Sequence, residues 1–317
     1  MESGKLMMRK LADLHSRRFA KSQTFILVLM ITLFASCGEI YDLNGFDWEP
    51  DTPPSDSVFN REIQVLDWGL SNLPEGHRPL DDSDPMLFSL EKFSTVHIAY
   101  KSSERWDISI GGLGGLSSNN GGHAGVGYGS SAVGGLLLLD SAYSQVTSVP
   151  EDNRFSTPGN AGLDNFNGSG LGYIYYTFFG NAFRPDMVEW SRSSDPDKAA
   201  TGNRYLHMMY CLSEDLARTF PGLNSGYYEV RPKTIIVRTA NGNYVKLEMQ
   251  SYYKGTLDPR EMRRGTDMPG GYMSFRYMVI RADERRFGFV ARRPPLTVDL
   301  TNKKITVGEE NVEHIEE

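Results

Sequence analysis

Short runs in which apolar and polar residues alternate recur through the middle and the C-terminal part of the chain. Residues 244–250 follow this period of two, and the alternation is expected to turn Lys246 and Glu248 outward to solvent. The run before them, residues 233–239, is connected to them through Asn241-Gly242, and an Asn-Gly pair is the strongest short-range hairpin signal. The two runs therefore predict a β-hairpin.

Other β-prone runs lie on both sides of this hairpin, separated by glycine, asparagine or proline. The interval 180–226 breaks the pattern, because apolar residues from Leu206 to Phe220 recur at helical spacing, so a helix is expected near 204–219. The pattern as a whole predicts an all-β fold, a single antiparallel β-rich domain with a small helical insertion. Strands are expected over residues 88–100, 106–110, 136–139, 173–179 and 271–279.

The N-terminal part of the chain shows a different pattern. Basic residues precede a short apolar run, Phe25–Phe34, and the small residues Ala35 and Ser36 then lead to Cys37. This order is typical of a secretory signal peptide, and small residues followed by cysteine indicate its lipoprotein form. We expect cleavage before Cys37 and lipid, such as palmitate, on its thiol, so that acyl chains anchor the mature chain to a membrane. The alternative is an ordinary signal peptide with an incidental cysteine.

Composition and charge complete this organisation. The formal net charge of −7 provides no basic footprint for a nucleic-acid partner. If Cys37 is acylated, Cys211 has no disulfide partner and is expected to be a small buried hydrophobe. The expected parts are the signal peptide (1–36), a flexible stalk rich in proline and acidic residues (37–60), the β domain (61–307, with the insertion at 180–226) and an acidic tail (308–317).

Four ordered blocks carry a family resemblance. They are Trp106-Asp107-Ile108-Ser109-Ile110, Tyr143-Ser144-Gln145-Val146-Thr147-Ser148-Val149-Pro150, the hairpin segment from Thr234 to Gly255, and Gly271-Tyr272-Met273-Ser274-Phe275-Arg276-Tyr277. Behind a lipoprotein signal, these blocks resemble the HmuY-like family, outer-membrane lipoproteins of Bacteroidota that act as haemophores. The matches span about residues 88 to 280, and the hairpin is the most specific of them.

The resemblance implies a single all-β domain in which two loops grip haem between paired axial ligands, His in some members and Met in others. It also implies a lipid-anchored protein of the outer membrane, exposed at the cell surface, that transfers haem to a TonB-dependent outer-membrane receptor. Two alternatives remain open. One is an HmuY-like surface lipoprotein that binds a siderophore or another porphyrin, and the other is a structural or adhesive lipoprotein without a small-molecule ligand.

The family's ligand positions are not His or Met in this chain. The first ligand follows the Trp-Asp strand, where this chain has residues 111–114, Gly-Gly-Leu-Gly, and residues 140–165 near the second position contain neither His nor Met. His123 in the glycine-rich loop is the first candidate, because imidazole binds haem iron and glycines allow close approach to a flat macrocycle. The competing interpretation is a solvent-exposed loop histidine.

The opposing haem ligand is expected from the 180–226 insertion. Its candidates are Met187, His207 and Met208. The alternative for Met187 is a surface methionine, and the alternative for His207 and Met208 is packing of the expected helix in the protein interior. The glycines around Val126 lack the spacing of a dinucleotide fingerprint, and the sequence contains no nucleophile elbow, His-Glu-x-x-His pair or phosphate loop. We therefore expect a protein that binds without catalysis.

Overall fold

The computed structural model describes residues 58–69, 85–111, 114–164, 172–177, 183–220, 222–223, 228–288, 295–302 and 304–307. These residues belong to one of two compact units of the chain, Glu49–Glu317. The predicted signal peptide, Cys37 and the acidic tail lie outside the described residues. Val58 and Phe59, at the end of the predicted stalk, are buried, so the packed domain begins before residue 61.

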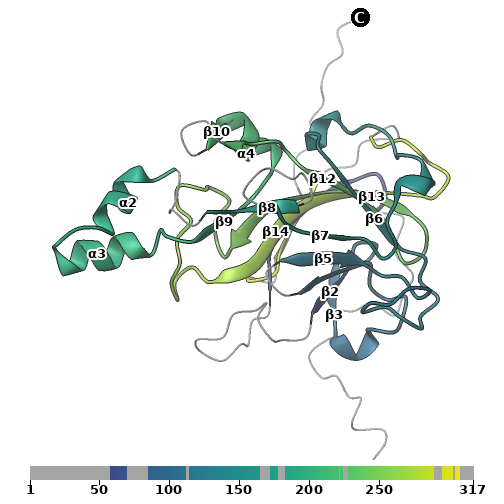
Figure 1. Cartoon of the computed structure of the whole chain (residues 1–317). Coiled ribbons are helices and arrows are strands. Elements are labelled where there is room, and N and C mark those ends of the chain that lie inside the picture. The colour runs from purple at the N-terminus through teal and green to yellow at the C-terminus, as the bar shows by residue number, and fades with distance from the viewer. Residues whose placement is uncertain are drawn as a thin grey trace, which may run out of the picture. The chain divides into compact units, whose positions relative to one another are not determined.

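Two seven-stranded sheets form the body of this unit (Figure 1). Sheet A has the strand order β16 (Lys304–Val307), β15 (Leu296–Asp299), β1 (Glu62–Trp68), β14 (Gly270–Ile280), β13 (Tyr244–Tyr253), β12 (Thr234–Arg238) and β6 (Gly135–Leu139). Sheet B has the order β3 (Ser94–Val96), β2 (Met86–Ser89), β4 (Ile108–Gly111), β5 (Gly115–Ser118), β7 (Asn160–Asp164), β8 (Gly172–Thr177) and β9 (Met208–Cys211).

The remaining regular elements of the described residues are short. A two-stranded ribbon pairs β10 (Gly222–Leu223) with β11 (Tyr228–Glu229). The α-helices are α2 (Pro185–Trp190), α3 (Pro196–Asn203) and α4 (Glu214–Thr219). Single 3-10 turns occur at η2 (Ile98–Tyr100), η3 (Tyr143–Gln145) and η4 (Asp152–Arg154).

The all-β prediction is confirmed, and its clearest element is the predicted hairpin. β12 and β13 pair antiparallel, with Val237 opposite Val245. Gly242 in their connection has a φ of 89°, which glycine adopts without strain. β14 continues the meander on the other side of β13. Two neighbouring pairs are parallel, β1 with β15 and β7 with β8, so each sheet is mixed rather than purely antiparallel.

The inner faces of the two sheets enclose the larger hydrophobic core. Within it, Trp68, Phe88 and Phe275 make edge-to-face contacts, with ring centroids 5.1 Å apart for Trp68–Phe88 and 5.4 Å apart for Phe88–Phe275. None of the three side chains is more than 1% exposed. Phe88 belongs to sheet B and the other two to sheet A, so this aromatic cluster holds the two sheets together.

The outer face of sheet A is covered along β13, contrary to the prediction that Lys246 and Glu248 point to solvent. Lys246 is 7% exposed and Glu248 is 0% exposed. Residues around η3 cover Lys246, whose Nζ donates to the carbonyl oxygens of Tyr143 and Val146, both at 3.1 Å. The alternation along β13 is as predicted, but a segment distant in the sequence covers the polar face.

Glu248 lies within a buried ionic network on this face. Its carboxylate accepts hydrogen bonds from Arg276 Nε and from the backbone N–H of Glu214, both at 2.7 Å. Arg276 also lies 3.4 Å from the Glu214 carboxylate. Burial raises the pKa of Glu248 although Arg276 acts in the opposite direction, and burial lowers the pKa of Lys246 to about 8. Pairing within the protein therefore replaces the hydration of these charges.

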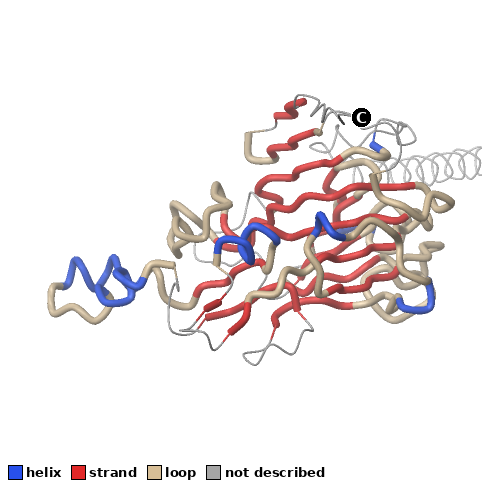
Figure 2. The backbone as a smooth tube through the Cα atoms, turned by 90° about the horizontal axis from the view of Figure 1, so that it is seen from above, coloured by secondary structure: helices blue, strands red, loops and turns tan. Residues whose placement is uncertain are grey.

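Two helices project from sheet B as an arm, residues 183–207 (Figures 1 and 2). Each helix begins at a proline, and Asp195 caps α3 by accepting hydrogen bonds from the N–H groups of Asp197 and Lys198. The predicted helix near 204–219 is wrong in its first half, because β9 pairs there with β8 and tertiary pairing overrides the helical spacing. Among the described residues, no helix has the length and apolar character to cross a membrane.

Two buried carboxylates join the sheets at the hairpin turn. Asp107 accepts hydrogen bonds from the N–H groups of Leu90 at 2.7 Å and Ala240 at 2.9 Å, and Glu91 accepts one from Thr239 Oγ1 at 2.6 Å. Neither acid is more than 3% exposed. Burial, together with the charge of Glu91, raises the pKa of Asp107 to about 7.

Because the pKa of Asp107 is raised in the folded protein, we expect the free energy of unfolding to fall as the pH rises from about 4 to about 7. In this range the folded carboxyl keeps a proton that the unfolded chain, with the ordinary pKa of 3.8, has already released. The effect is on the order of a few kcal/mol. Thermal unfolding measured at about pH 5 and about pH 7.5 should show that the wild type loses more stability between these two pH values than Asp107→Asn does. Asp197→Asn, at an exposed position, should keep the wild-type profile, and a profile unchanged by Asp107→Asn would contradict the prediction.

Candidate functional site

Tyr176 and His207 form a hydrogen-bonded pair where sheet B meets the arm. Tyr176 lies on β8 and His207 directly precedes β9, and the strand pairing places Tyr176 opposite Met209. Tyr176 Oη lies 3.0 Å from His207 Nδ1, and the two rings stack at an interplanar angle of 23°. His207 is exposed and Tyr176 is half-buried, so the phenol orients an imidazole at the surface.

The backbone of His207 adopts the left-handed region, with a φ of 56°. Such a conformation costs a residue other than glycine about 1–3 kcal/mol and is concentrated at functional sites. In metal-binding histidines, one ring nitrogen usually bonds to a protein group while the other coordinates the metal. His and Tyr are both known axial ligands of haem iron. The pair therefore has the chemistry of a haem ligand with its orienting partner.

The two methionine candidates are used for packing. Met208 is 0% exposed, and its Sδ accepts a hydrogen bond from Tyr253 Oη at 3.7 Å. Met187 is buried in the arm, where Gly202 of α3 lies so close that a Cβ would be 2.6 Å from the Met187 carbonyl oxygen. In this structure, packing describes both methionines better than presentation of a thioether to a ligand.

His123 is exposed in the loop between β5 and β6. Hydrogen bonds fix the course of this loop, since Asn119 Nδ2 donates to the carbonyl oxygens of Ser103 and Trp106, both at 2.8 Å. A Cβ at Gly127 would clash with Asn119 Oδ1. The glycines of this loop therefore allow it to pack closely on itself.

β13 separates His123 from the arm. The His123 loop lies at the start of β13, where the Val133 N–H donates a hydrogen bond to the Ala240 carbonyl of the hairpin turn at 3.0 Å. The arm lies beyond the end of β13, where the Arg264 N–H donates to the Arg204 carbonyl at 2.7 Å. The 10 residues of β13 cover about 30 Å at the usual rise, and two ligands of one metal ion lie only about 4 Å apart. The structure thus does not bring His123 together with Met187, His207 or Met208.

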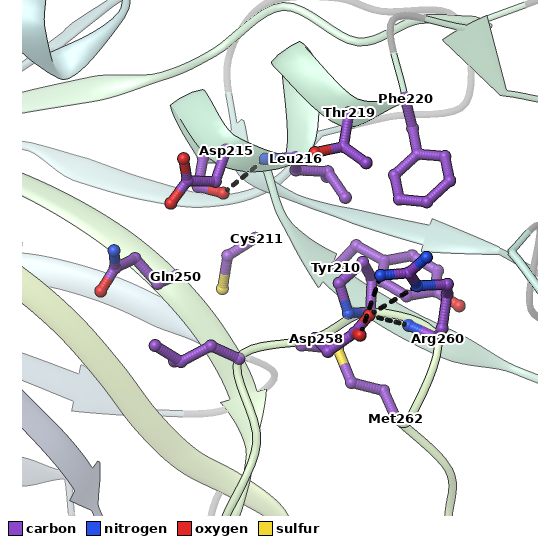
Figure 3. A pocket seen from close by; sticks show the side chains of 13 residues that line it. Tyr210, Cys211, Asp215, Leu216, Thr219, Phe220, Gln250, Asp258, Arg260 and Met262 are labelled. Carbon is purple, nitrogen blue, oxygen red and sulfur yellow. Dashed lines mark hydrogen bonds and ion pairs between the residues drawn. The ribbon is translucent and has the colours of Figure 1, made fainter.

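A cavity beside α4 was not anticipated from the sequence (Figure 3). Its volume is about 190 Å³, with Leu216, Phe220 and Met262 on its apolar side and Gln250, Asp258 and Arg260 on its polar side. Cavities for drug-sized ligands measure about 300–1,000 Å³, so a porphyrin does not fit this space. No local signal could have revealed it, because segments distant in the sequence form it only when they pack together.

The described residues provide neither a metal-binding group of side chains nor a reactive thiol. There, no group of three or more His, Cys, Asp or Glu side chains is placed to hold a metal ion. Cys211 is buried, and burial raises the pKa of its thiol well above the ordinary value. A thiol of this kind is unreactive, which confirms the prediction of a small buried hydrophobe.

Tyr176 is the residue of the pair that the sequence did not single out. It was expected only as part of a strand, and it lies 31 residues before His207. Nothing in the local pattern connects the two side chains, because the pairing of β8 with β9 brings them together.

Comparisons with known proteins give no family assignment. No family model matches the chain, and no curated protein matches it. The chain is similar to a crystal structure from Bacteroides vulgatus described as that of an HmuY-like haem-binding protein, with 15% identity, coverage of 67% of this chain and 97% of that chain, and a TM-score of 0.26. A TM-score this low carries no argument about the function of this chain.

Proposed function

We propose that this chain is a lipid-anchored protein of the outer membrane that captures haem at the cell surface without catalysis. The hydrogen-bonded pair of Tyr176 and His207 carries the proposal, because it orients an exposed imidazole at the root of the arm. The residue order ahead of Cys37 supports the lipid anchor. The HmuY-like sequence blocks support haem as the ligand and a TonB-dependent receptor as its recipient.

The residues present fit one side of a haem group, which would supply an iron that an imidazole can bind. His207 would hold this iron, and Tyr176 Oη, 3.0 Å from His207 Nδ1, would keep the imidazole in its orientation. Met187 and Met208 are buried, so the described residues supply His207 as the ligand from the arm.

Haemin added to the purified protein is expected to give a saturable shift of the Soret band, and His207→Ala should abolish or strongly alter it. The substitution removes the coordinating nitrogen and leaves the β8–β9 pairing in place. Tyr176→Phe keeps the aromatic ring but removes the hydrogen bond to Nδ1, so haemin affinity should fall by about tenfold with the band retained. Absorption titrations under oxidising and reducing conditions measure both effects.

His123→Ala is the matched control, since it removes an exposed imidazole from the other end of β13. Its spectrum should equal that of the wild type. If the Soret shift were lost in His123→Ala and retained in His207→Ala, His123 would be the iron ligand instead. A band abolished by Tyr176→Phe would instead assign the iron bond to the phenolate. A flat titration of the wild type would exclude haem capture and favour a structural or adhesive lipoprotein.

The cavity beside α4 favours a second candidate function, capture of a small amphipathic molecule. Its volume of about 190 Å³ is slightly larger than that of an engineered apolar cavity of about 150 Å³ that binds benzene. One side of the cavity is apolar and the other carries the bonded pair Asp258–Arg260. A flat haemin titration, together with a small amphipathic compound that raises the melting temperature, would favour this candidate over haem.

A further inference from the structure

Three arginines gather where the arm meets the connection between β13 and β14. The Arg204 carbonyl accepts a hydrogen bond from the Arg264 N–H at 2.7 Å, and Arg204 Nε donates to the Arg264 carbonyl at 3.0 Å. Asp267 forms ion pairs with both Arg204 and Arg263. A Cβ at Gly265 would lie 2.6 Å from the Arg204 guanidinium, so glycine makes room for it. The fold thus fixes this cluster through backbone bonds and close packing.

Within the described part of the chain, Arg264 has no carboxylate partner. Its guanidinium donates to the carbonyl oxygen of Asn203 at 3.5 Å, and the residue is exposed. The neighbouring Arg260, by contrast, is bonded twice to the Asp258 carboxylate, at 3.1 Å each. Among the described residues, Arg204, Arg263 and Arg264 therefore share one carboxylate, that of Asp267, which leaves this cluster a net positive charge.

This cluster lies beside the Tyr176–His207 pair. Arg204 precedes His207 by three positions, so their Cα atoms are at most about 11 Å apart. The Arg264 guanidinium donates to the carbonyl oxygen of Asn203, four positions before His207. The Arg264 N–H donates to the carbonyl oxygen of Arg204, three positions before His207. These bonds hold the positive cluster against the segment that leads into His207.

We infer that Arg264, held beside Arg204 and Arg263, binds the carboxylates of an anionic ligand, namely the two propionates on one edge of a haem group. The inference rests on the proposed function, because it places the iron at His207 and the carboxylate edge at the root of the arm. A guanidinium binds a carboxylate through two parallel hydrogen bonds, which are stronger than neutral ones. The site should therefore select porphyrin dicarboxylates over their uncharged esters.

Porphyrins with free and esterified carboxyl groups test this selection. The wild type is expected to bind haemin about tenfold more tightly than haemin dimethyl ester, and Arg264→Gln should remove the preference. Arg231→Gln makes the same change of charge at an exposed arginine that is paired with Glu229, and should keep the preference. Fluorescence titrations with iron-free protoporphyrin IX and its dimethyl ester measure carboxylate recognition without an iron bond.

The outcomes separate the inference from the proposed function. Equal affinity for acid and ester, or a preference that survives in Arg264→Gln, would overturn the inference while haemin ligation by His207 stands. The protein could prefer protoporphyrin IX over its dimethyl ester only when Arg264 is present, while haemin shows no iron ligation. This result would support the inference and overturn the iron site. Absence of binding by both haemin and protoporphyrin IX would overturn both.

Discussion

Phe88→Ala is expected to lower the free energy of unfolding by about 3–5 kcal/mol. Phe88 is 0% exposed and contacts Trp68 and Phe275 of the opposite sheet, with ring centroids 5.1 and 5.4 Å away. Truncation removes the burial free energy of the ring and leaves a cavity between two sheets that hydrogen-bond ladders hold in shape. Because whole domains are stable by only about 5–15 kcal/mol, this substitution should bring the protein close to unfolding.

Chemical denaturation followed by tryptophan fluorescence measures this loss, and Trp68 reports on it directly because its ring contacts Phe88. Tyr128→Ala is the control, since Tyr128 is 65% exposed and its removal should change stability by less than about 0.5 kcal/mol. If Phe88→Ala cost no more than this control, the two sheets would not depend on a shared core.

Arg276→Met is expected to lower the free energy of unfolding by about 3–5 kcal/mol at neutral pH. The substitution leaves Glu248, which is 0% exposed, without the cation that lies 2.7 Å from its carboxylate. Burial already raises the pKa of Glu248, and loss of Arg276 should raise it further. The carboxyl would then take up a proton as the pH falls, so the loss of stability should become smaller toward acid pH. A loss of packing alone would not depend on pH in this way.

The double variant Arg276→Met/Glu248→Met separates pairing from packing. Removing both charges should recover part of the stability lost in Arg276→Met, because a buried ion pair replaced by apolar side chains often costs little. Arg260→Met removes an arginine from an exposed ion pair and should change stability little. A double variant less stable than Arg276→Met would show that Glu248 contributes through bonds other than the one to Arg276.

The parts of the fold that follow from local signals could be predicted from the sequence. Asn241-Gly242 fixes both the turn and the register of β12 against β13, and alternation of side chains marks the strands on either side. The covering of Lys246 could not be predicted in this way, because its hydrogen-bond acceptor Tyr143 lies 103 residues away. A pattern of period two identifies two faces but not the segment that later packs on each.

The candidate site shows the same limit. His207 and Met208 are neighbours in the sequence and both have the chemistry of a haem ligand. The start of β9 sends Met208 into the core, where Tyr253 bonds its sulfur, and leaves His207 exposed beside Tyr176. Residue type identified candidates, but the pairing of β8 with β9 decided which of them faces the surface.

The position of β1 has a consequence for how the protein is made. β1 comes first among the described strands, yet it lies inside sheet A between β15 and β14, and Gln64 donates a hydrogen bond to the Phe275 carbonyl 211 residues away. Sheet A cannot close until almost the whole chain has been synthesised, and contacts of such long range make folding slow. In the exported protein proposed here, this delay would keep the newly made chain unfolded, the state in which a polypeptide passes through a translocation pore.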